Sequence, residues 1–276
     1  MTVRICAAQT ACVWGRPAET LDAAATAVEA ATAQGASLIA FPEQYPIGWD
    51  PFARFRVEDL GGATVTALRD LARRNAVAIV AGIRERHDPL PRNTSVAIGP
   101  RGEVLATYAK VHLFSPAREH EQFSAGDGLG IFSLEGVTFG LALCYDLRFP
   151  DLFSLYAAAG AECTIVPAAW PCRRAEHWEV FIRARALENQ YFVAGINTVG
   201  STPVDRYCGR SMVAGPGGEV LARAKEGEER IFADISPASI GEARALIPLH
   251  SDRRDDLYKR LRKDMSSGQC GENSMH

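Results

Sequence analysis

Residues 137–159 read VTFGLALCYDLRFPDLFSLYAAA, which predicts a strand, a sharp turn and a helix in succession. The apolar run from Val137 to Leu143 has the length of a buried strand. Pro150 suits the first turn of a helix, and residues 151–159 continue that helix. Cys144 is therefore expected at the elbow between the strand and the helix.

Strands and helices alternate on both sides of this elbow. Strands are expected at residues 3–8, 37–41, 77–81, 163–166, 192–196 and 230–235, and helices at 21–31, 65–75 and 174–190. Hairpins are expected where strands 94–98 and 104–108 flank the turn 100–103, and around the turn 215–218. This order predicts an α/β fold in which helices cover one side of a mixed sheet.

Length and composition indicate one domain over residues 1–276, because 47% of its 276 residues are hydrophobic and provide a large core. Residues 266–276, SSGQCGENSMH, are polar and are expected to form a flexible tail. The formal net charge is −3 and the basic residues are scattered, so a nucleic-acid partner is not expected.

The cysteines and the hydropathy pattern indicate a cytoplasmic protein. The seven cysteines form no CxxC pair, and an odd number does not suit a complete disulfide framework. We therefore expect thiols in a reducing cytosol, with the cysteines other than Cys144 acting as small buried hydrophobic residues. Neither a signal peptide nor an apolar run of about 18 residues is evident, so no membrane association is expected.

Three segments contain the residue types that amide hydrolysis requires. These are FPEQY (41–45), YAKVHLF (108–114) and LCYDLRFP (143–150). The reaction needs a nucleophile, a base that takes its proton, and fixed donors where the carbonyl oxygen becomes negative. A cysteine, a glutamate and a lysine supply these functions in Cys144, Glu43 and Lys110.

In these segments the sequence resembles the nitrilase, or carbon–nitrogen hydrolase, superfamily, whose members have a Glu-Lys-Cys triad in this order. The resemblance continues through PAAWP (167–171), HWE (177–179), RARALENQ (183–190) and GRSMVAGP (209–216). It implies Glu43 as general base, Lys110 as the cation that stabilises the tetrahedral intermediate, and Cys144 as nucleophile. It also implies an αββα four-layer sandwich.

The elbow suggests how Cys144 would be activated. A thiolate near the start of a helix is stabilised by exposed N–H groups, and a nearby lysine lowers its pKa further. The N–H of Tyr145 is then a natural oxyanion donor beside Lys110. Glu43 follows an apolar strand, so we expect partial burial to raise its pKa toward neutrality.

A second active-site glutamate is expected in the segment REHEQFSAGD (118–127), which resembles the place where the superfamily holds one. Glu119 has the better offset from the following aromatic residue and Gly-Asp turn. Glu121 is the competing candidate, and a charged loop without a catalytic role is the other alternative.

The histidines leave one further mechanism open. None combines with acids or cysteines at a metal-binding spacing, so no metal is expected. A cysteine–histidine dyad with His112 or His120 as base is the alternative to the triad. No serine lies in a GxSxG setting, which weakens a serine hydrolase.

The motifs most resemble the small-amide branch that includes omega-amidases, which deamidate 2-oxo acid amides such as 2-oxoglutaramate. Tyr145 and Trp170 are the expected substrate-binding residues, although Trp170 is equally consistent with a core position. Gln44 stands where omega-amidases favour methionine. An aliphatic amidase, an N-carbamoyl-amine hydrolase and a deaminated glutathione amidase therefore stay open.

The resemblance also implies an assembly. Members of the superfamily form homodimers that extend the sandwich to αββααββα, and they usually need no cofactor. A non-catalytic binding protein on the same fold is the alternative of a different class. The presence of Glu43, Lys110 and Cys144 in matching contexts favours the enzyme.

Overall fold

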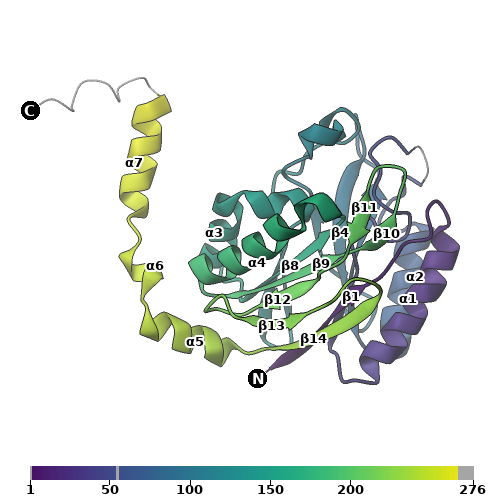
Figure 1. Ribbon diagram of the computed structural model, residues 1–276, viewed down its shortest axis with the longest axis horizontal. Coiled ribbons are helices and arrows are strands. Elements are labelled where there is room, and N and C mark those ends of the chain that lie inside the picture. Colours follow the sequence, from purple (N-terminus) through teal and green to yellow (C-terminus); the bar gives the residue numbers. More distant parts are fainter. Residues whose placement is uncertain (1, 54–55, 267–276) are drawn as a thin grey trace, which may run out of the picture.

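Two six-stranded mixed sheets form the centre of the molecule (Figure 1), in a computed structural model that describes residues 2–53 and 56–266. The first sheet has the order β14 (Glu229–Ile235), β1 (Val3–Gln9), β2 (Leu38–Ala40), β3 (Ala78–Glu85), β4 (Arg92–Ile98) and β5 (Val104–Ala109). The second has the order β13 (Val220–Arg223), β12 (Met212–Ala214), β9 (Phe192–Asn197), β8 (Cys163–Ala168), β7 (Val137–Leu141) and β6 (Gly130–Leu134).

Helices cover the outer face of each sheet. The first sheet packs against α1 (Pro17–Thr32) and α2 (Ala63–Asn75), and the second against α3 (Pro150–Ala158) and α4 (Ala175–Asn189) (Figure 1). The α/β sandwich implied by the superfamily resemblance is confirmed. The single sheet predicted from the alternation alone is wrong, because periodicity locates strands without identifying their partners.

Alternating side chains explain why the two sheets stack. Along β1, Val3, Ile5 and Ala7 lie in the core shared with the second sheet, whereas Cys6 and Ala8 lie in the core beneath α1 and α2. Successive residues of a strand point to opposite faces, so an almost wholly apolar strand is buried on both.

Strand directions bring the predicted site residues to one edge of the sandwich. In the first sheet β2 and β3 are parallel, and β5 regains their direction because it is antiparallel to β4, which is antiparallel to β3. In the second sheet β7 and β8 are parallel. Glu43 follows β2, Lys110 follows β5 and Cys144 follows β7, as expected for ligand sites at carboxyl ends of strands.

The C-terminal helices α5 (Pro237–Leu246), α6 (Leu249–Asp252) and α7 (Asp255–Ser266) extend away from the sandwich (Figure 1). Of the predicted flexible tail, Ser266 ends α7 and residues 267–276 lie outside the described residues. No helix within residues 2–53 and 56–266 is both long and apolar enough to span a membrane.

The expectation that all cysteines are thiols is wrong for Cys172 and Cys208, which form a disulfide. Cys172 begins the 3-10 helix η4 (Cys172–Arg174), and Cys208 ends β11 (Arg206–Cys208). A β-bridge between Pro171 and Tyr207 holds these segments together, so the two Cα atoms lie 5.0 Å apart. The odd number of cysteines could not reveal this pairing, because it depends on tertiary contact.

Candidate active site

The ammonium group of Lys110 is buried between two carboxylates. Its Nζ donates to Glu43 Oε1 at 2.7 Å and to Glu119 Oε2 at 2.9 Å, and all three side chains are at most 1% exposed. A buried charge needs opposite charges and hydrogen bonds to replace water. These contacts bring together three of the residues predicted from sequence.

Neutral donors fix both carboxylates. Asn93 Nδ2 donates to Glu43 Oε1 at 2.8 Å and to Glu119 Oε1 at 3.0 Å. Glu119 also accepts from Trp49 Nε1 at 3.2 Å and from the Phe114 N–H at 2.7 Å. Glu43 Oε2 accepts from the Ala169 N–H at 3.1 Å. Each carboxylate oxygen therefore has a donor that fixes its orientation beside Lys110.

Glu119 and Glu121, the two candidates for the second active-site glutamate, differ in burial and in partners. Glu119 is fully buried in the cluster, whereas Glu121 is exposed and pairs with Arg118 at 2.6 Å. The competing candidate Glu121 therefore lies outside the cluster.

Burial and the Lys110 charge move the two carboxyl pKa values apart. Burial raises the pKa of Glu43, and the Glu119 charge adds to this, while Lys110 opposes both. Burial also acts to raise the pKa of Glu119, but the Lys110 charge and the Phe114 N–H together outweigh it and the pKa is lowered. Glu43 is thus the carboxylate better suited to exchange a proton.

Burial alone would lower the pKa of Lys110, but the charges of Glu119 and Glu43 raise it well above its usual value. The group therefore remains a cation and is unsuited to serve as a base.

Cys144 lies at a sharp elbow that follows β7. It begins the 3-10 helix η3 (Cys144–Arg148) with a φ of 42°, a left-handed conformation that is uncommon for residues other than glycine. Asp146 anchors the elbow by accepting from the Leu143 N–H and the Tyr108 hydroxyl, at 2.9 and 2.8 Å. Side-chain anchoring of this kind holds the strained residue in place.

The expectation of a low pKa for Cys144 is wrong. Burial raises the pKa of its thiol well above the usual value, and the negative charge of Glu43 adds to this. Lys110 acts in the opposite direction but does not prevail. The resting side chain is a thiol, so it needs a base to take its proton during attack.

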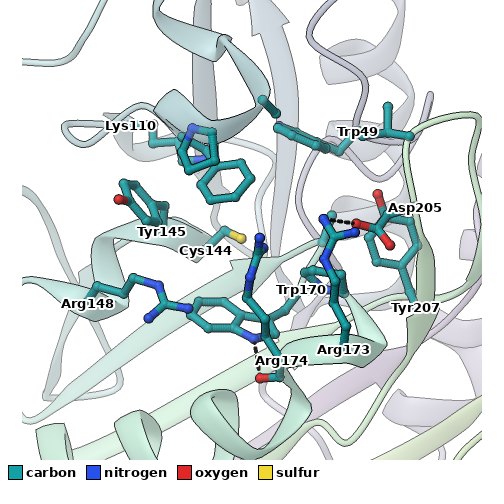
Figure 2. A pocket seen from close by; sticks show the side chains of 16 residues that line it. Trp49, Lys110, Cys144, Tyr145, Arg148, Trp170, Arg173, Arg174, Asp205 and Tyr207 are labelled. Carbon is teal, nitrogen blue, oxygen red and sulfur yellow. Dashed lines mark hydrogen bonds and ion pairs between the residues drawn. The ribbon is translucent and has the colours of Figure 1, made fainter.

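A pocket of about 590 Å³ of empty space opens over this cluster, with Cys144 and Lys110 in its wall. Figure 2 shows the Cys144 sulfur and the Arg174 guanidinium directed toward the same space. Tyr145 and Trp170, the two predicted substrate-binding residues, both line the pocket. Its wall combines aromatic rings with charged side chains, as is common in small-molecule sites.

Trp170 proves to be both a core residue and a pocket residue. Only 3% of it is exposed, and its Nε1 donates to the Arg174 carbonyl at 2.7 Å. The guanidinium of Arg148 lies over its ring, 4.9 Å from the centroid. Trp170 therefore forms a rigid part of the pocket wall while most of its surface is buried in the core.

The two histidines of the alternative dyad are placed differently. His112 Nδ1 is 2.8 Å from Asp146 Oδ1, and its ring stacks on Phe149 at 3.6 Å between centroids. His120 is exposed. Glu43 is the carboxylate whose charge acts on the Cys144 thiol, and neither histidine is a main contributor to the pKa shift of that thiol, so the surroundings of Cys144 favour Glu43 as the base.

Asn93 and Asp146 are functional candidates that sequence reasoning missed. Asn93 is a buried amide within the otherwise ordinary strand β4, and Asp146 is a buried carboxylate two residues after Cys144. For Asn93, the available signal was a polar residue at a strand position where the alternation places the side chain in the interior. Asp146 lies within the segment LCYDLRFP (143–150), but the sequence analysis assigned it no role.

Comparison with known proteins places the chain among carbon–nitrogen hydrolases. Residues 2–245 match the carbon-nitrogen hydrolase family. The chain is 34% identical over 249 residues to a 2-oxoglutaramate amidase of Bacillus subtilis (strain 168), covering 89% of this chain and 95% of that protein. It is also 34% identical over 242 residues to omega-amidase NIT2 of Homo sapiens, covering 83% and 87%.

Solved structures agree. A CN-hydrolase superfamily protein of Xanthomonas campestris, with an arsenic adduct in its active site, superposes with a TM-score of 0.86 at 30% identity, covering 92% of this chain and 97% of that one. An amidase of Nesterenkonia sp. AN1 has a TM-score of 0.83 at 28% identity, covering 94% and 96%. That structure shows covalent addition of the acetamide moiety of fluoroacetamide at the active-site cysteine. Fold, sequence and the family match thus agree over most of the chain, which belongs to the carbon-nitrogen hydrolase family.

Proposed function

We propose that this protein hydrolyses a small carboxamide to the acid and ammonia through a thioester on Cys144. The observation that carries the proposal is the buried ammonium of Lys110, held by Glu43 and Glu119 in the wall of the pocket that contains Cys144. A fixed cation beside a nucleophile is the arrangement that stabilises an oxyanion.

In the first half-reaction Glu43 accepts the proton of Cys144 while the sulfur attacks the amide carbonyl carbon. The carbonyl π electrons move to oxygen, where Lys110 and the Tyr145 N–H stabilise the negative charge. Tyr145 is the second residue of η3, and the first N–H groups of a helix have no acceptor within it. When the carbon–nitrogen bond breaks, Glu43 returns the proton and ammonia leaves.

In the second half-reaction Glu43 takes a proton from water, and the resulting hydroxide attacks the thioester. The carbon–sulfur bond breaks, the sulfur regains a proton from Glu43, and the acid leaves. Glu119, whose pKa is lowered despite its burial, mainly by the charge of Lys110, stays ionised and keeps Lys110 charged. We also propose that Glu119 orients the substrate amide and its leaving group.

For the substrate we propose 2-oxo acid amides such as 2-oxoglutaramate. The support is the similarity to a 2-oxoglutaramate amidase and to an omega-amidase, together with the arginines in the wall of the pocket that contains Cys144. Aliphatic amides, N-carbamoyl amines and deaminated glutathione are the competing substrates.

The test is ammonia release from a panel of 2-oxoglutaramate, 2-oxosuccinamate, a simple aliphatic amide, an N-carbamoyl amine, deaminated glutathione and a nitrile. We expect the 2-oxo amides to give the highest kcat/KM and Cys144→Ala to abolish turnover. Cys12→Ala is the matched control, since Cys12 is a free cysteine that does not line the pocket. No turnover of any amide by pure wild-type protein would instead favour a binding protein.

We propose a homodimer as the active assembly. Support comes from apolar side chains left exposed on α3 and α4 and on the projecting helix α7. Those with the largest exposed fractions are Leu155, Val180, Leu187 and Met265, at 57, 63, 51 and 60%. Large apolar surfaces on one face are typical of interaction sites.

We propose the cytoplasm as its location, because a reducing compartment protects a nucleophilic thiol from oxidation. The Cys172–Cys208 pair provides the test. If the proposal holds, alkylation during cell lysis labels both cysteines as thiols in most molecules. A pair that is fully oxidised in freshly lysed cells would contradict it.

A further inference from the structure

Arginines concentrate positive charge in the wall of the active-site pocket. Arg148, Arg173 and Arg174 line it together with one acidic residue, Asp205, an excess of two positive charges. The whole chain has a formal net charge of −3. This concentration of arginine therefore departs from the average composition of the chain.

Two of these arginines already have partners. Arg173 forms an ion pair with Asp205 at 2.8 Å, which Figure 2 shows at one side of the pocket. Arg148 packs over the rings of Trp170 and Phe181 and lies 3.3 Å from His177 Nδ1. Both guanidinium groups are thereby held in place.

Arg174 differs from its neighbours. Its guanidinium forms no hydrogen bond or ion pair with any residue in the described part of the chain, and it lies 5.2 Å from the centroid of the Phe114 ring. Its backbone is fixed, because its carbonyl accepts from Trp170 Nε1. Partial burial lowers the pKa of Arg174, and the positive charges of Arg173 and Arg148 lower it further. Both effects penalise the positive charge of Arg174, so an anion bound beside it would be stabilised.

The two kinds of cation in the pocket wall differ in their surroundings. Lys110 is held between the carboxylates of Glu43 and Glu119, which disfavour a further anion beside it. Arg174 has no carboxylate partner in the described part of the chain and offers a planar donor fork suited to bidentate binding of a carboxylate. A substrate with an amide at one end and a carboxylate at the other would bind in one orientation.

We propose that Arg174 binds the distal carboxylate of the substrate and so selects monoamides of short dicarboxylic acids. This inference rests on the proposed amidase function and assigns the residue that determines its specificity. The rings of Phe114 and Trp170, which line the same pocket, would pack against the chain between the two ends.

The test compares glutaramate with pentanamide, which has the same chain length but a methyl group in place of the carboxylate. Arg174→Gln should lower the ratio of kcat/KM for glutaramate to that for pentanamide by about 10- to 100-fold, the worth of a charged hydrogen-bonded pair. The loss should lie mainly in KM, because the carboxylate is bound equally in ground and transition states.

Arg206→Gln is the matched control, since it removes the same charge from an exposed position on β11 that does not line the pocket. It should leave the ratio within about twofold of wild type. Equal losses on both amides in Arg174→Gln would overturn the proposal.

A binding measurement separates this inference from the proposed function. Calorimetric titration with pentanoate, which has a single carboxylate, should show that Arg174→Gln weakens affinity by about tenfold or more, whereas Arg206→Gln does not. If wild type hydrolyses neither amide yet shows this loss, the amidase proposal fails and the carboxylate site stands. Unchanged pentanoate affinity in Arg174→Gln would remove the carboxylate site, whatever the turnover.

Discussion

Cys144 depends on its neighbours for reactivity. Burial and the nearby Glu43 charge raise the pKa of its thiol, so little thiolate is present in the resting site. In the proposed mechanism attack is therefore coupled to proton transfer, and the raised pKa of Glu43 suits it to serve as the base. Nucleophile and base are matched, because the same burial raises both pKa values.

The pH profile should report this base. Burial and the Glu119 charge raise the pKa of Glu43, so kcat/KM should rise with pH through a limb above the ordinary value of 4.5. Below that limb Glu43 is protonated and cannot accept the Cys144 proton. The measurement is kcat/KM for 2-oxoglutaramate across the acidic and neutral range, with Glu121→Gln as an exposed-carboxylate control. An acid limb at or below 4.5 would exclude Glu43 as the base.

Asp146 should act as a positioning residue. It is fully buried and also accepts from the His112 N–H at 2.9 Å, in addition to its bonds at the elbow. Asp146→Asn replaces one acceptor oxygen by an N–H₂ donor, which disturbs the conformation of Cys144. Small misplacements of a nucleophile cost about 100-fold, so kcat should fall by about 10- to 100-fold with a smaller change in KM.

The control for Asp146 is Asp127→Asn, which changes an aspartate whose side chain is 87% exposed. Circular dichroism checks that each variant is folded. A folded Asp146→Asn enzyme with wild-type kcat would show that the elbow holds Cys144 without this carboxylate.

The sequence predicted residues with a recognisable motif and missed those defined by contacts. Glu43, Lys110 and Cys144 stand in segments that resemble a known family, and Glu119 followed from its offset. Asn93 and Arg174 have no motif, because their roles arise from what surrounds them after folding. The direction in which the Cys144 pKa shifts was likewise not predictable from the sequence, since it depends on burial as well as on charge.

A disulfide links two segments of the pocket wall. Cys172 begins η4, which also contains Arg173 and Arg174, and Cys208 ends β11. The Arg173–Asp205 ion pair crosses between the same parts of the chain. Where the disulfide is formed, it and the ion pair together fix the wall from which Arg174 reaches the pocket.

Removing this disulfide should destabilise the protein. The two cysteines are separated by 36 positions. Closing a loop of this size lowers the entropy of the unfolded chain, which raises its free energy by about 4 kcal/mol. The free energy of unfolding of the Cys172→Ser, Cys208→Ser double variant should therefore be about 2 to 4 kcal/mol lower than that of oxidised wild type. Urea denaturation of oxidised wild type and the variant measures the difference. Cys12→Ser controls for cysteine loss, and equal midpoints for all three proteins would mean that the bond adds no stability.

Helices and strands were predictable because each follows from local periodicity. The partners of the strands were not, because β7, β8 and β9 have the same apolar character as β1, β2 and β3. Residue patterns therefore suggested one mixed sheet, and only the family resemblance implied two. Pairing is decided by connections and by packing between the sheets.

For the whole molecule, catalysis depends on how the sheets pack. Glu43 and Lys110 follow strands of the first sheet, whereas Cys144 follows a strand of the second. The Ala169 N–H, at the end of β8, donates to Glu43 Oε2 at 3.1 Å and joins the two halves. A shift of one sheet relative to the other would separate the proposed base, Glu43, from the proposed nucleophile, Cys144.

Exposed apolar residues on the outer helices of the second sheet support the proposed homodimer. Val180 and Leu187 lie seven positions apart on α4, so they share one face, and α3 packs beside it with Leu155 exposed. Helix α7 has apolar residues at Leu257, Leu261 and Met265, a spacing that forms one stripe. Exposed apolar faces on α4 and α7 suit a second copy of this chain.

The proposed homodimer should depend on apolar contact across α4. We expect wild type to sediment at twice the 29.9 kDa mass of the chain. The double variant Val180→Asp, Leu187→Asp should sediment as a monomer, because its two new carboxylates would be buried in the interface without partners. Val104→Asp, at an exposed apolar position on β5, is the control and should remain dimeric. Analytical ultracentrifugation over a range of protein concentrations provides the measurement. Wild type that stays monomeric throughout would leave the apolar face of α4 unexplained by self-association.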